Sequence, residues 1–409
     1  MFTPKPRPTA TTVWRAVQRT PLRARACSSP RSSGGTASGP GPGSVPPVPI
    51  PASSRVARPV RTGTLPPLAS WHSRRSGDLY TPVVQPTDRE GSDPGSLAVS
   101  VVVCVRNGAA TLASQLEALA GQVDAPGFEV VLVDNGSTDG TVAVFEQWAA
   151  AGMGVVADAR VVDASEQVGL CFARNRGAAA ARAPVLAYCD ADDVVGSTWV
   201  AAVHAASISG ALAVGGRVLV LDAARRPTSQ VLLDSLDSLG PDDGAERVFP
   251  YFWGCNFAMS AATLAAVGGF DEGLPPYGCD DVEIGIRLAV AGVTLAYEPR
   301  MEVFYDPPRG LRRRLTRTYR AGIAEACLWA RHPGLYRQRP TAVALLLALP
   351  STPIRAALGS RGGARRRVLA AAEATARDLG LVRGLRRWVA GGRLRPFHGS
   401  TVLLPRQGP

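Results

Sequence analysis

Aspartate residues cluster in the tetrapeptide Asp190-Ala191-Asp192-Asp193, directly after an apolar run over 183–189. Carboxylates one residue apart can bind a hard divalent cation, which in turn binds phosphate oxygens. A strand that ends in carboxylates places acceptor oxygens at the carboxyl edge of a sheet, where open α/β folds bind their ligands. A simple turn is the alternative interpretation, because Asp is common in turns and at helix N-caps.

Two further carboxylate sites occupy similar positions. Asp134 ends the apolar run 128–133, and Asp280 with Asp281 opens an amphipathic segment that runs to residue 291. If the strands are parallel, Asp134 and Asp190 share one edge and a nucleotide can lie across them. Asp134 would accept hydrogen bonds from a base, Asp190 from a ribose hydroxyl, and Asp192 would bind a cation that neutralises a diphosphate. A turn at Asp134 and simple N-capping at Asp280 are the structural alternatives.

Arg174 lies between these sites in the sequence, near the start of a helix predicted over 169–181. The N-terminus of a helix favours anions, and a guanidinium group binds phosphate oxygens. The position therefore suits a contact to phosphate, although a solvated arginine on a helix surface is the alternative.

The elements that position these side chains alternate along the chain. Apolar runs predict strands over 98–105, 128–133, 154–162, 183–189 and 211–221, and helical periodicity predicts helices over 111–121, 141–151, 169–181 and 197–209. Such alternation with short links predicts an α/β fold, with a Rossmann-like parallel sheet and helices on both faces. Residues 225–248 are polar and are predicted to form a loop.

Charge divides the chain into three parts. Residues 1–77 contain 12 Lys and Arg but no Asp or Glu, residues 78–306 contain 30 acidic and 12 basic residues, and residues 307–409 contain 21 basic and 3 acidic residues. We predict a disordered Pro/Gly/Ser/Arg-rich tail over 1–95, a folded domain over 96–306, and Arg-rich helices over 307–409 that are broken at Pro340 and Pro353. The net charge of +12 alone would suit a nucleic-acid-binding protein. The acidic middle and the lack of a recognised motif argue against that class, so no nucleic-acid partner is expected.

The cysteines and the hydropathy of the chain indicate where in the cell the protein is expected. Seven cysteines without a CxxC pair predict reduced, mostly buried thiols and a cytoplasmic protein, and four scattered histidines give no zinc pattern. The longest apolar stretch, 342–349, is far shorter than the roughly 18 residues that span a bilayer, so no transmembrane helix is expected. The Arg-rich C-terminal segments predict peripheral contact with the inner face of the plasma membrane, with solvated helices packed on the folded domain as the alternative.

Seven motifs taken together resemble family 2 glycosyltransferases with a GT-A fold. They are VVVCVRNG (101–108), VDNGSTDG (133–140), ARNRG (173–177), DADD (190–193), GCNFAM (254–259), VGGFDE (267–272) and DDVEI (280–284) followed by Arg287, Leu288 and Gly292. The resemblance covers about residues 97–306, half of the chain. It implies that a sugar moves with inversion from a nucleotide diphosphate donor to an acceptor hydroxyl.

The resemblance also implies roles for single residues. Asp281 takes the place of the catalytic base, with Asp280 where Glu is commoner, and Asp192 holds Mg²⁺ or Mn²⁺. The donor site comprises Val105, Asn107, Asp134, Arg174 and Asp190. The acceptor-side candidates are Trp253, Asn256 and Asp280, and the ring of Trp253 either stacks on a sugar or packs in the core. The expected acceptor is a glycan or a lipid-linked glycan of the cell envelope or of an exopolysaccharide.

One departure from the family pattern concerns the metal site. Many relatives place a His after the final strand, whereas this chain has Val303-Phe304-Tyr305-Asp306 there. Tyr305 or Asp306 is a candidate replacement, and the alternative is a cation held by Asp192, the diphosphate and water alone. We therefore predict weak metal affinity in the absence of nucleotide.

A nucleotidyltransferase is the other enzyme class that uses carboxylates and a metal on an α/β sheet. It would require a Gly-rich, Lys-bearing phosphate loop after the first strand, and residues 105–108 do not supply one.

Overall fold

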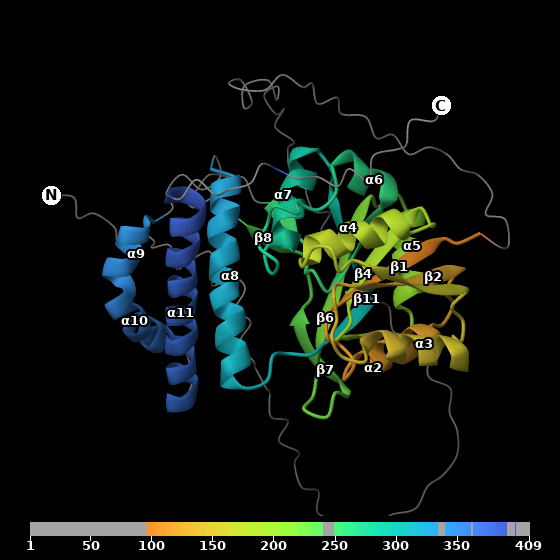
Figure 1. The fold of residues 1–409 in the computed structure, drawn as a ribbon, viewed down its shortest axis with the longest axis horizontal. Coiled ribbons are helices and arrows are strands. Elements are labelled where there is room, and N and C mark those ends of the chain that lie inside the picture. Colours follow the sequence, from red (N-terminus) through yellow and green to blue (C-terminus); the bar gives the residue numbers. More distant parts are fainter. Residues whose placement is uncertain (1–95, 240–248, 334–339, 361–362, 391–396, 398–409) are drawn as a thin grey trace, which may run out of the picture. The chain divides into compact units, whose positions relative to one another are not determined.

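The computed structural model describes residues 96–239, 249–333, 340–360, 363–390 and 397 (Figure 1). The tail predicted over 1–95 lies outside the described residues. A nine-stranded sheet with the order β3-β2-β1-β4-β10-β6-β11-β5 organises the first part, and β7 pairs with β6 beside this path. A separate two-stranded sheet joins β8 (Asp237–Leu239) to β9 (Phe249–Tyr251).

One half of the large sheet is parallel and buried on both faces. It consists of β1 (Val99–Val105), β2 (Phe128–Asp134), β3 (Asp158–Asp163) and β4 (Val185–Asp190). The intervening helices are α2 (Leu112–Ala120), α3 (Thr141–Ala151) and α4 (Leu170–Ala180). Val102 of β1 packs into one hydrophobic cluster while Val101 and Val103 pack into the other, as expected when both faces are covered. A Cβ on Gly177 would lie 2.4 Å from Cγ1 of Val102, so only glycine lets α4 approach β1 this closely.

The other half of the sheet is mixed, and the prediction of a parallel sheet is wrong there. The strand β10 (Asn256–Ser260) runs antiparallel to both β4 and β6 (Ala213–Leu221), and β11 (Leu295–Tyr305) runs parallel to β6. The short strands β5 (Val194–Val195) and β7 (Pro227–Leu233) pair antiparallel with β11 and β6. A parallel β10 would need a crossover helix after β6, but that connection carries β7, β8 and β9 instead. The loop predicted over 225–248 is thus partly strand.

Three further helices flank this half of the sheet: α5 (Trp199–Ile208), α6 (Ala261–Ala266) and α7 (Asp280–Val290). The side chains of Trp199, Phe257 and Phe270 are among the largest that are fully buried, and they fill the space between these helices and the strands. The observed architecture is therefore an α/β sheet with helices on both faces, as predicted.

Four α-helices follow the sheet in the described part of the chain. The long helices α8 (Leu311–Arg331) and α11 (Ala364–Leu385) pack closely because a Cβ on Gly322 would lie 2.3 Å from the carbonyl oxygen of Arg377. Trp329 of α8 and Leu381 of α11 belong to the same hydrophobic cluster as Phe257 and Phe270. These helices therefore share a core with the sheet region.

The apolar stretch after Pro340 continues further than the sequence interpretation allowed. Helix α9 (Ala342–Ala348) is followed by the 3₁₀ turn η3 (Leu349–Ser351) and by α10 (Thr352–Gly359). Pro353 lies in the first turn of α10, where its missing N–H breaks no hydrogen bond. Together, Ala342–Gly359 form one helical stretch of 18 residues that is long and apolar enough to cross a membrane, by length and composition only. The sequence prediction that no segment is long and apolar enough to span a membrane is therefore wrong.

Candidate active site

The carboxyl edge of the parallel strands brings Asp134 and Asp190 together, as the sequence predicts. In the strand register Val105 pairs with Asp134 and its neighbour Cys104 pairs with Asp190. Asp134 accepts a hydrogen bond from the backbone N–H of Ser137 at 3.1 Å, which closes the turn after β2 and leaves further lone pairs on the carboxylate. The edge can therefore present acceptor oxygens to a nucleotide.

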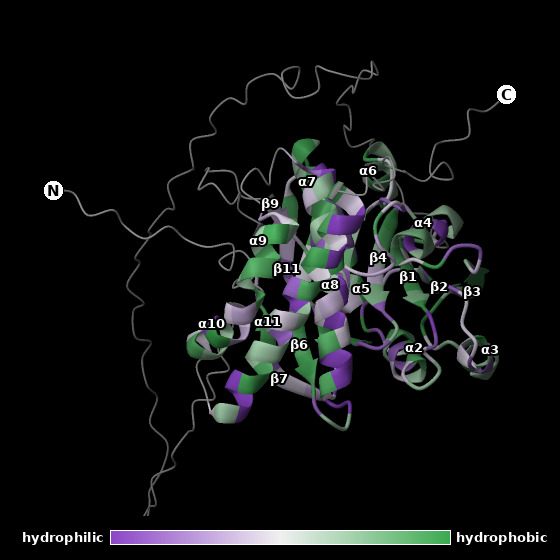
Figure 2. Ribbon diagram, turned by 60° about the vertical axis from the view of Figure 1, so that its left-hand side comes forward, coloured by the Kyte–Doolittle hydropathy of each residue, from purple (hydrophilic) through white to green (hydrophobic). Residues whose placement is uncertain are grey.

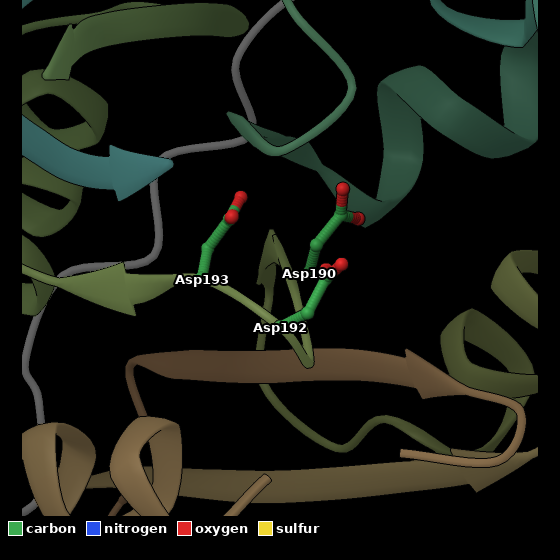
Figure 3. A group of neighbouring side chains, drawn as sticks. All are labelled: Asp190, Asp192 and Asp193. Atoms are coloured by element: carbon green, nitrogen blue, oxygen red, sulfur yellow. The ribbon is translucent and has the colours of Figure 1, made fainter. Parts of the chain in front are cut away.

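Three carboxylates follow β4 in one tight group (Figure 3). One oxygen each from Asp190, Asp192 and Asp193 lies within 4.8 Å of the others. Burial and the charge of Asp192 raise the pKa of Asp190 to about 7, against the opposing effect of Arg174. Burial and the charges of Asp190 and Asp192 likewise raise the pKa of Asp193 well above its usual range.

This group fits a divalent cation. The Oδ2 atom of Asp193 is buried without a hydrogen-bond partner, whereas its Oδ1 atom accepts from the backbone N–H of Asp306 at 2.8 Å. Three mutually repelling carboxylates with an unsatisfied oxygen are stabilised by a hard cation, and an all-oxygen donor set suits Mg²⁺ or Mn²⁺. Asp192, the predicted metal ligand, is the exposed member of the group.

Asp306, a candidate replacement for the missing His, is engaged elsewhere. Its carboxylate pairs with Arg225 and with Arg309, the latter at 2.7 Å. Arg225 also donates a hydrogen bond to the backbone carbonyl of Asp192 at 2.9 Å. Asp306 therefore helps to hold the acidic turn in place through arginines.

A basic side chain approaches the same region from α8. The guanidinium carbon of Arg317 lies 5.4 Å from the ring centroid of Tyr305, within the range of a cation–π contact. The ring of Tyr305 in turn meets Trp253 edge-on at 6.2 Å. The charge of Arg317 lowers the pKa of Asp190, which places it within electrostatic reach of the acidic turn.

Arg174 is buried rather than solvated. Its guanidinium group is paired with the Asp280 carboxylate and donates to the carbonyl oxygen of Gly254 at 2.6 Å. The rings of Phe257 and Phe270 lie 5.1 and 5.4 Å from its guanidinium carbon. Arg174 is only 2% exposed, and its predicted contact with the donor stays a prediction. The arginine instead fixes Asp280, which is buried against it and is not open to an acceptor.

Asp281 lies beside this pair in the first turn of α7. Its Oδ2 atom accepts from the backbone N–H of Gly254 at 3.0 Å, and its Oδ1 atom accepts from the backbone N–H of Val282 at 2.8 Å. Burial and the charge of Asp280 raise the pKa of Asp281 to about 6, although Arg174 opposes them. A carboxylate with such a pKa is ionised at neutral pH and is well matched to accept a proton.

The backbone around Asp281 is constrained. Cys279, which precedes α7, has a left-handed φ of 62°, uncommon for a non-glycine residue. A Cβ on Gly254 would lie 3.0 Å from Nη2 of Arg174 and 3.4 Å from Oδ2 of Asp281. Glycine at this position therefore allows the arginine and both aspartates to meet around one peptide.

Three other predicted site residues are Asn256, Val105 and Asn107. Asn256 is 1% exposed, and its side-chain amide bonds to Trp199, Arg217 and Met301 in the core. Both polar atoms of the Asn256 side chain thus have internal partners, and its acceptor-side role stays a prediction. The side chain of Val105 is buried, and Asn107 accepts from the backbone N–H of Thr138 at 2.7 Å, so that it joins two loops at the carboxyl edge.

Sequence reasoning missed several residues that hold the site. Asn135 is buried, accepts from the N–H of Gly169 and donates to the carbonyl oxygens of Ala164 and Gln167. Gln115 bonds to the carbonyl of Asp190 and to the N–H of Val195, on both sides of the acidic turn. A polar residue on the apolar face of a predicted helix, as at Gln115, was an available signal. No local pattern pointed to Arg317.

Known proteins share the sheet region. Residues 100–262 match the family described as Glycosyl transferase family 2. Validoxylamine A glucosyltransferase of Streptomyces hygroscopicus subsp. limoneus is 31% identical over 231 residues, which cover 48% of this chain and 49% of that protein. Pre-mycofactocin glycosyltransferase of Mycobacterium tuberculosis (strain CDC 1551 / Oshkosh) is 29% identical over 257 residues, covering 60% of this chain and 50% of that protein.

Among solved structures, the mannosyltransferase PcManGT from Pyrobaculum calidifontis, in complex with GDP-Man and Mn²⁺, aligns with a TM-score of 0.42. It is 17% identical, and the alignment covers 76% of this chain and 80% of that one. The chain spans about half the length of the curated relatives that it matches. The family match and the mixed sheet with flanking helices confirm the predicted GT-A fold class.

Proposed function

We propose that the chain transfers a sugar from a nucleoside diphosphate donor to an acceptor hydroxyl, as its match to Glycosyl transferase family 2 over residues 100–262 supports. We infer a single displacement with inversion at the anomeric carbon. The observation that carries the proposal is the group of Asp190, Asp192 and Asp193 at the carboxyl edge, across β1 from Asp134.

The donor would lie across this edge. Asp134 accepts hydrogen bonds from the base, Asp190 from a ribose hydroxyl, and Asp192 with its neighbours holds Mg²⁺ or Mn²⁺. When bound, such a cation neutralises the charge that develops on the leaving diphosphate. Arg317 supplies a second positive charge on the same side, and the ring of Tyr305 orients it.

Asp281 is the proposed base. As the acceptor oxygen forms its bond to the anomeric carbon, the bond from that carbon to the diphosphate oxygen breaks and the diphosphate leaves with the electron pair. The proton of the acceptor hydroxyl passes to the carboxylate of Asp281. Arg174 and Asp280 position Asp281 through Gly254 and the start of α7.

The acceptor side is proposed from the position of Trp253. Trp253 is partly exposed beside Gly254 and Tyr305, so its ring is available to stack on a sugar. We propose a glycan or lipid-linked glycan acceptor, used in cell-envelope or exopolysaccharide synthesis on the cytoplasmic side of the membrane. The names of the two relatives give two different acceptors, and we propose neither of them for this chain.

A screen of nucleotide sugars tests the proposal. Thermal shift and hydrolysis are measured for UDP-glucose, UDP-GlcNAc and GDP-mannose, each with and without Mn²⁺. We expect at least one donor to stabilise the protein only with Mn²⁺, and Asp192→Asn to abolish that stabilisation. Asp124→Asn, at an exposed turn outside the carboxyl edge, is the control. Pyrophosphate release from a nucleoside triphosphate and a sugar phosphate would instead support a nucleotidyltransferase.

A further inference from the structure

The helical stretch Ala342–Gly359 exposes apolar side chains along one side. The exposed residues are Val343 (65%), Leu346 (43%), Leu347 (79%), Ile354 (60%) and Leu358 (80%). Positions 343, 347, 354 and 358 follow helical spacing, so they form one stripe along α9 and α10. In Figure 2 the ribbon of α9 is coloured mainly as hydrophobic.

The opposite side of this stretch is the one that packs. Leu345 is buried in the core cluster that also contains Leu381 of α11. The hydroxyl group of Thr352 is buried and bonds to Asp378 of α11 at 2.7 Å. Only 11% of the stretch is buried within the structure. Single exposed apolar residues are common, but four in one stripe, with Leu346 also exposed, indicate a surface that meets an apolar partner.

Arginine side chains lie at one end of this surface. Arg365, Arg366 and Arg367 in the first turn of α11 are exposed, and no carboxylate among the described residues forms an ion pair with them. An ion pair at 2.8 Å between Arg314 of α8 and Glu373 of α11 holds the start of α8 against α11. Arg312 and Arg313 at the start of α8 are also exposed.

These charges do not stabilise the helices that carry them. Arginine in the first turn of a helix is opposed by the positive end of the helix dipole. An anionic partner would offset that repulsion, and an apolar stripe flanked by arginines is the pattern of helices that lie in the headgroup region of anionic membranes.

We propose that α9, η3 and α10 dock on an anionic lipid bilayer, with the apolar stripe in the interface and the arginines at the lipid phosphates. The stretch lies on the membrane and does not cross it, because Arg355 is exposed within it and its inner side is packed on α11. Docking does not depend on the reaction. If the proposed function holds, docking brings the active site to a membrane-borne acceptor.

Vesicle sedimentation of the full chain tests this docking. Vesicles contain phosphatidylcholine alone or with 30 mol% phosphatidylglycerol, which is about the range of anionic content that basic surfaces sense. We expect binding to the anionic vesicles that weakens with salt. The double variant Leu347→Ser/Leu358→Ser should lower the partition coefficient about tenfold or more, since burying a leucine contributes at least that factor.

Ile208→Ser is the matched control, because Ile208 is 72% exposed on α5, away from this stripe. Both variants change only exposed side chains, so circular dichroism should show the wild-type fold. A chain that stays in the supernatant, or a double variant that binds like wild type, overturns the proposal. So does a stripe variant that converts a dimer to a monomer in sedimentation velocity, because a second copy would then cover the stripe. If the membrane-bound protein resists carbonate extraction, the stretch crosses the bilayer and does not lie on its surface, which also overturns the proposal.

The nucleotide-sugar screen separates this inference from the proposed function. The stripe variant should keep wild-type donor hydrolysis in solution even when it no longer binds vesicles. Loss of vesicle binding with normal hydrolysis supports both proposals, whereas vesicle binding without any donor turnover supports docking alone.

Discussion

Replacing Asp281 by Asn removes the proposed base while keeping the size of the side chain. General base catalysis contributes about 10²- to 10⁴-fold, so transfer should fall by about that factor. Donor binding should persist, because the proposed contacts to the base and ribose come from Asp134 of β2 and Asp190 of β4, whereas Asp281 belongs to α7 and accepts from Gly254 and Val282. In the wild type, kcat/KM should fall about tenfold per pH unit below the pKa of about 6 of the Asp281 carboxyl.

The same raised pKa has a cost in stability. The Asp281 carboxyl has an ordinary pKa of 3.8 in the unfolded chain and a pKa of about 6 in the folded protein, so the folded protein binds its proton more tightly. Proton binding by Asp281 therefore stabilises the folded state. This stabilisation is fully present below pH 3.8 and is lost as the pH rises through 6. The shift corresponds to about 3 kcal/mol, and solvent screening of the partly exposed group reduces it to about 1–3 kcal/mol.

Asn cannot ionise, so the stability of the Asp281→Asn variant does not fall in this way as the pH rises. Asn can accept only one of the two backbone hydrogen bonds, which costs about 1 kcal/mol at every pH. The informative quantity is therefore the change with pH: from pH 5 to pH 7.5, Asp281→Asn should gain stability relative to wild type, by about 1 kcal/mol. Urea denaturation at both pH values measures it, and Asp124→Asn at an exposed turn is the control.

Two results would refute this reasoning. Wild-type transfer by Asp281→Asn would exclude Asp281 as the base. A relative stability that does not change between pH 5 and pH 7.5 would show that the carboxyl titrates normally and is not held in the environment described above.

Two other variants test the groups around the base and the diphosphate. Arg174→Met should lower the free energy of unfolding by about 3–5 kcal/mol, because it leaves Asp280 buried without its partner. Adding Asp280→Asn should recover part of that loss in the same urea measurement, and no recovery would contradict the pairing. Arg317→Gln should weaken binding of UDP or GDP with Mn²⁺ about tenfold or more in calorimetry and leave UMP and GMP nearly unchanged. The exposed Arg320→Gln on the same helix is the control, and equal effects of the two variants would argue against a specific contact.

The parallel half of the fold was predictable because its signals are local. Near-continuous β-branched runs such as 99–105 and 128–133 form strands buried on both faces, and each ends where a polar turn begins. Their order in the sheet then places Asp134 and Asp190 at one edge, so this part of the site follows from sequence as well. The antiparallel β10 was not predictable, since its partners β4 and β6 are chosen by packing across long connections.

Two of the predicted site residues have internal partners that the sequence did not indicate. Arg174 and Asn256 are polar residues that sequence reasoning assigned to ligands, whereas the structure satisfies them internally, at Asp280 and Gly254 for one and at Trp199 and Met301 for the other. Sequence spacing cannot distinguish a polar group that faces a ligand from one that bonds to the protein, because both are required to be paired when buried.

The C-terminal helices are part of the catalytic unit in physical terms. Asp271 and Arg331 form a buried ion pair at 2.6 Å between the sheet region and the end of α8, and a Cβ on Gly278 would lie 3.3 Å from the Cβ of Ala324. These contacts fix α8, so the start of the same rigid helix holds Arg317 over Tyr305. A change in how α8 packs would therefore move a positive charge relative to the acidic turn. Because α9 and α10 pack on α11, which packs on α8, docking at the apolar stripe would act on the helix that carries this charge.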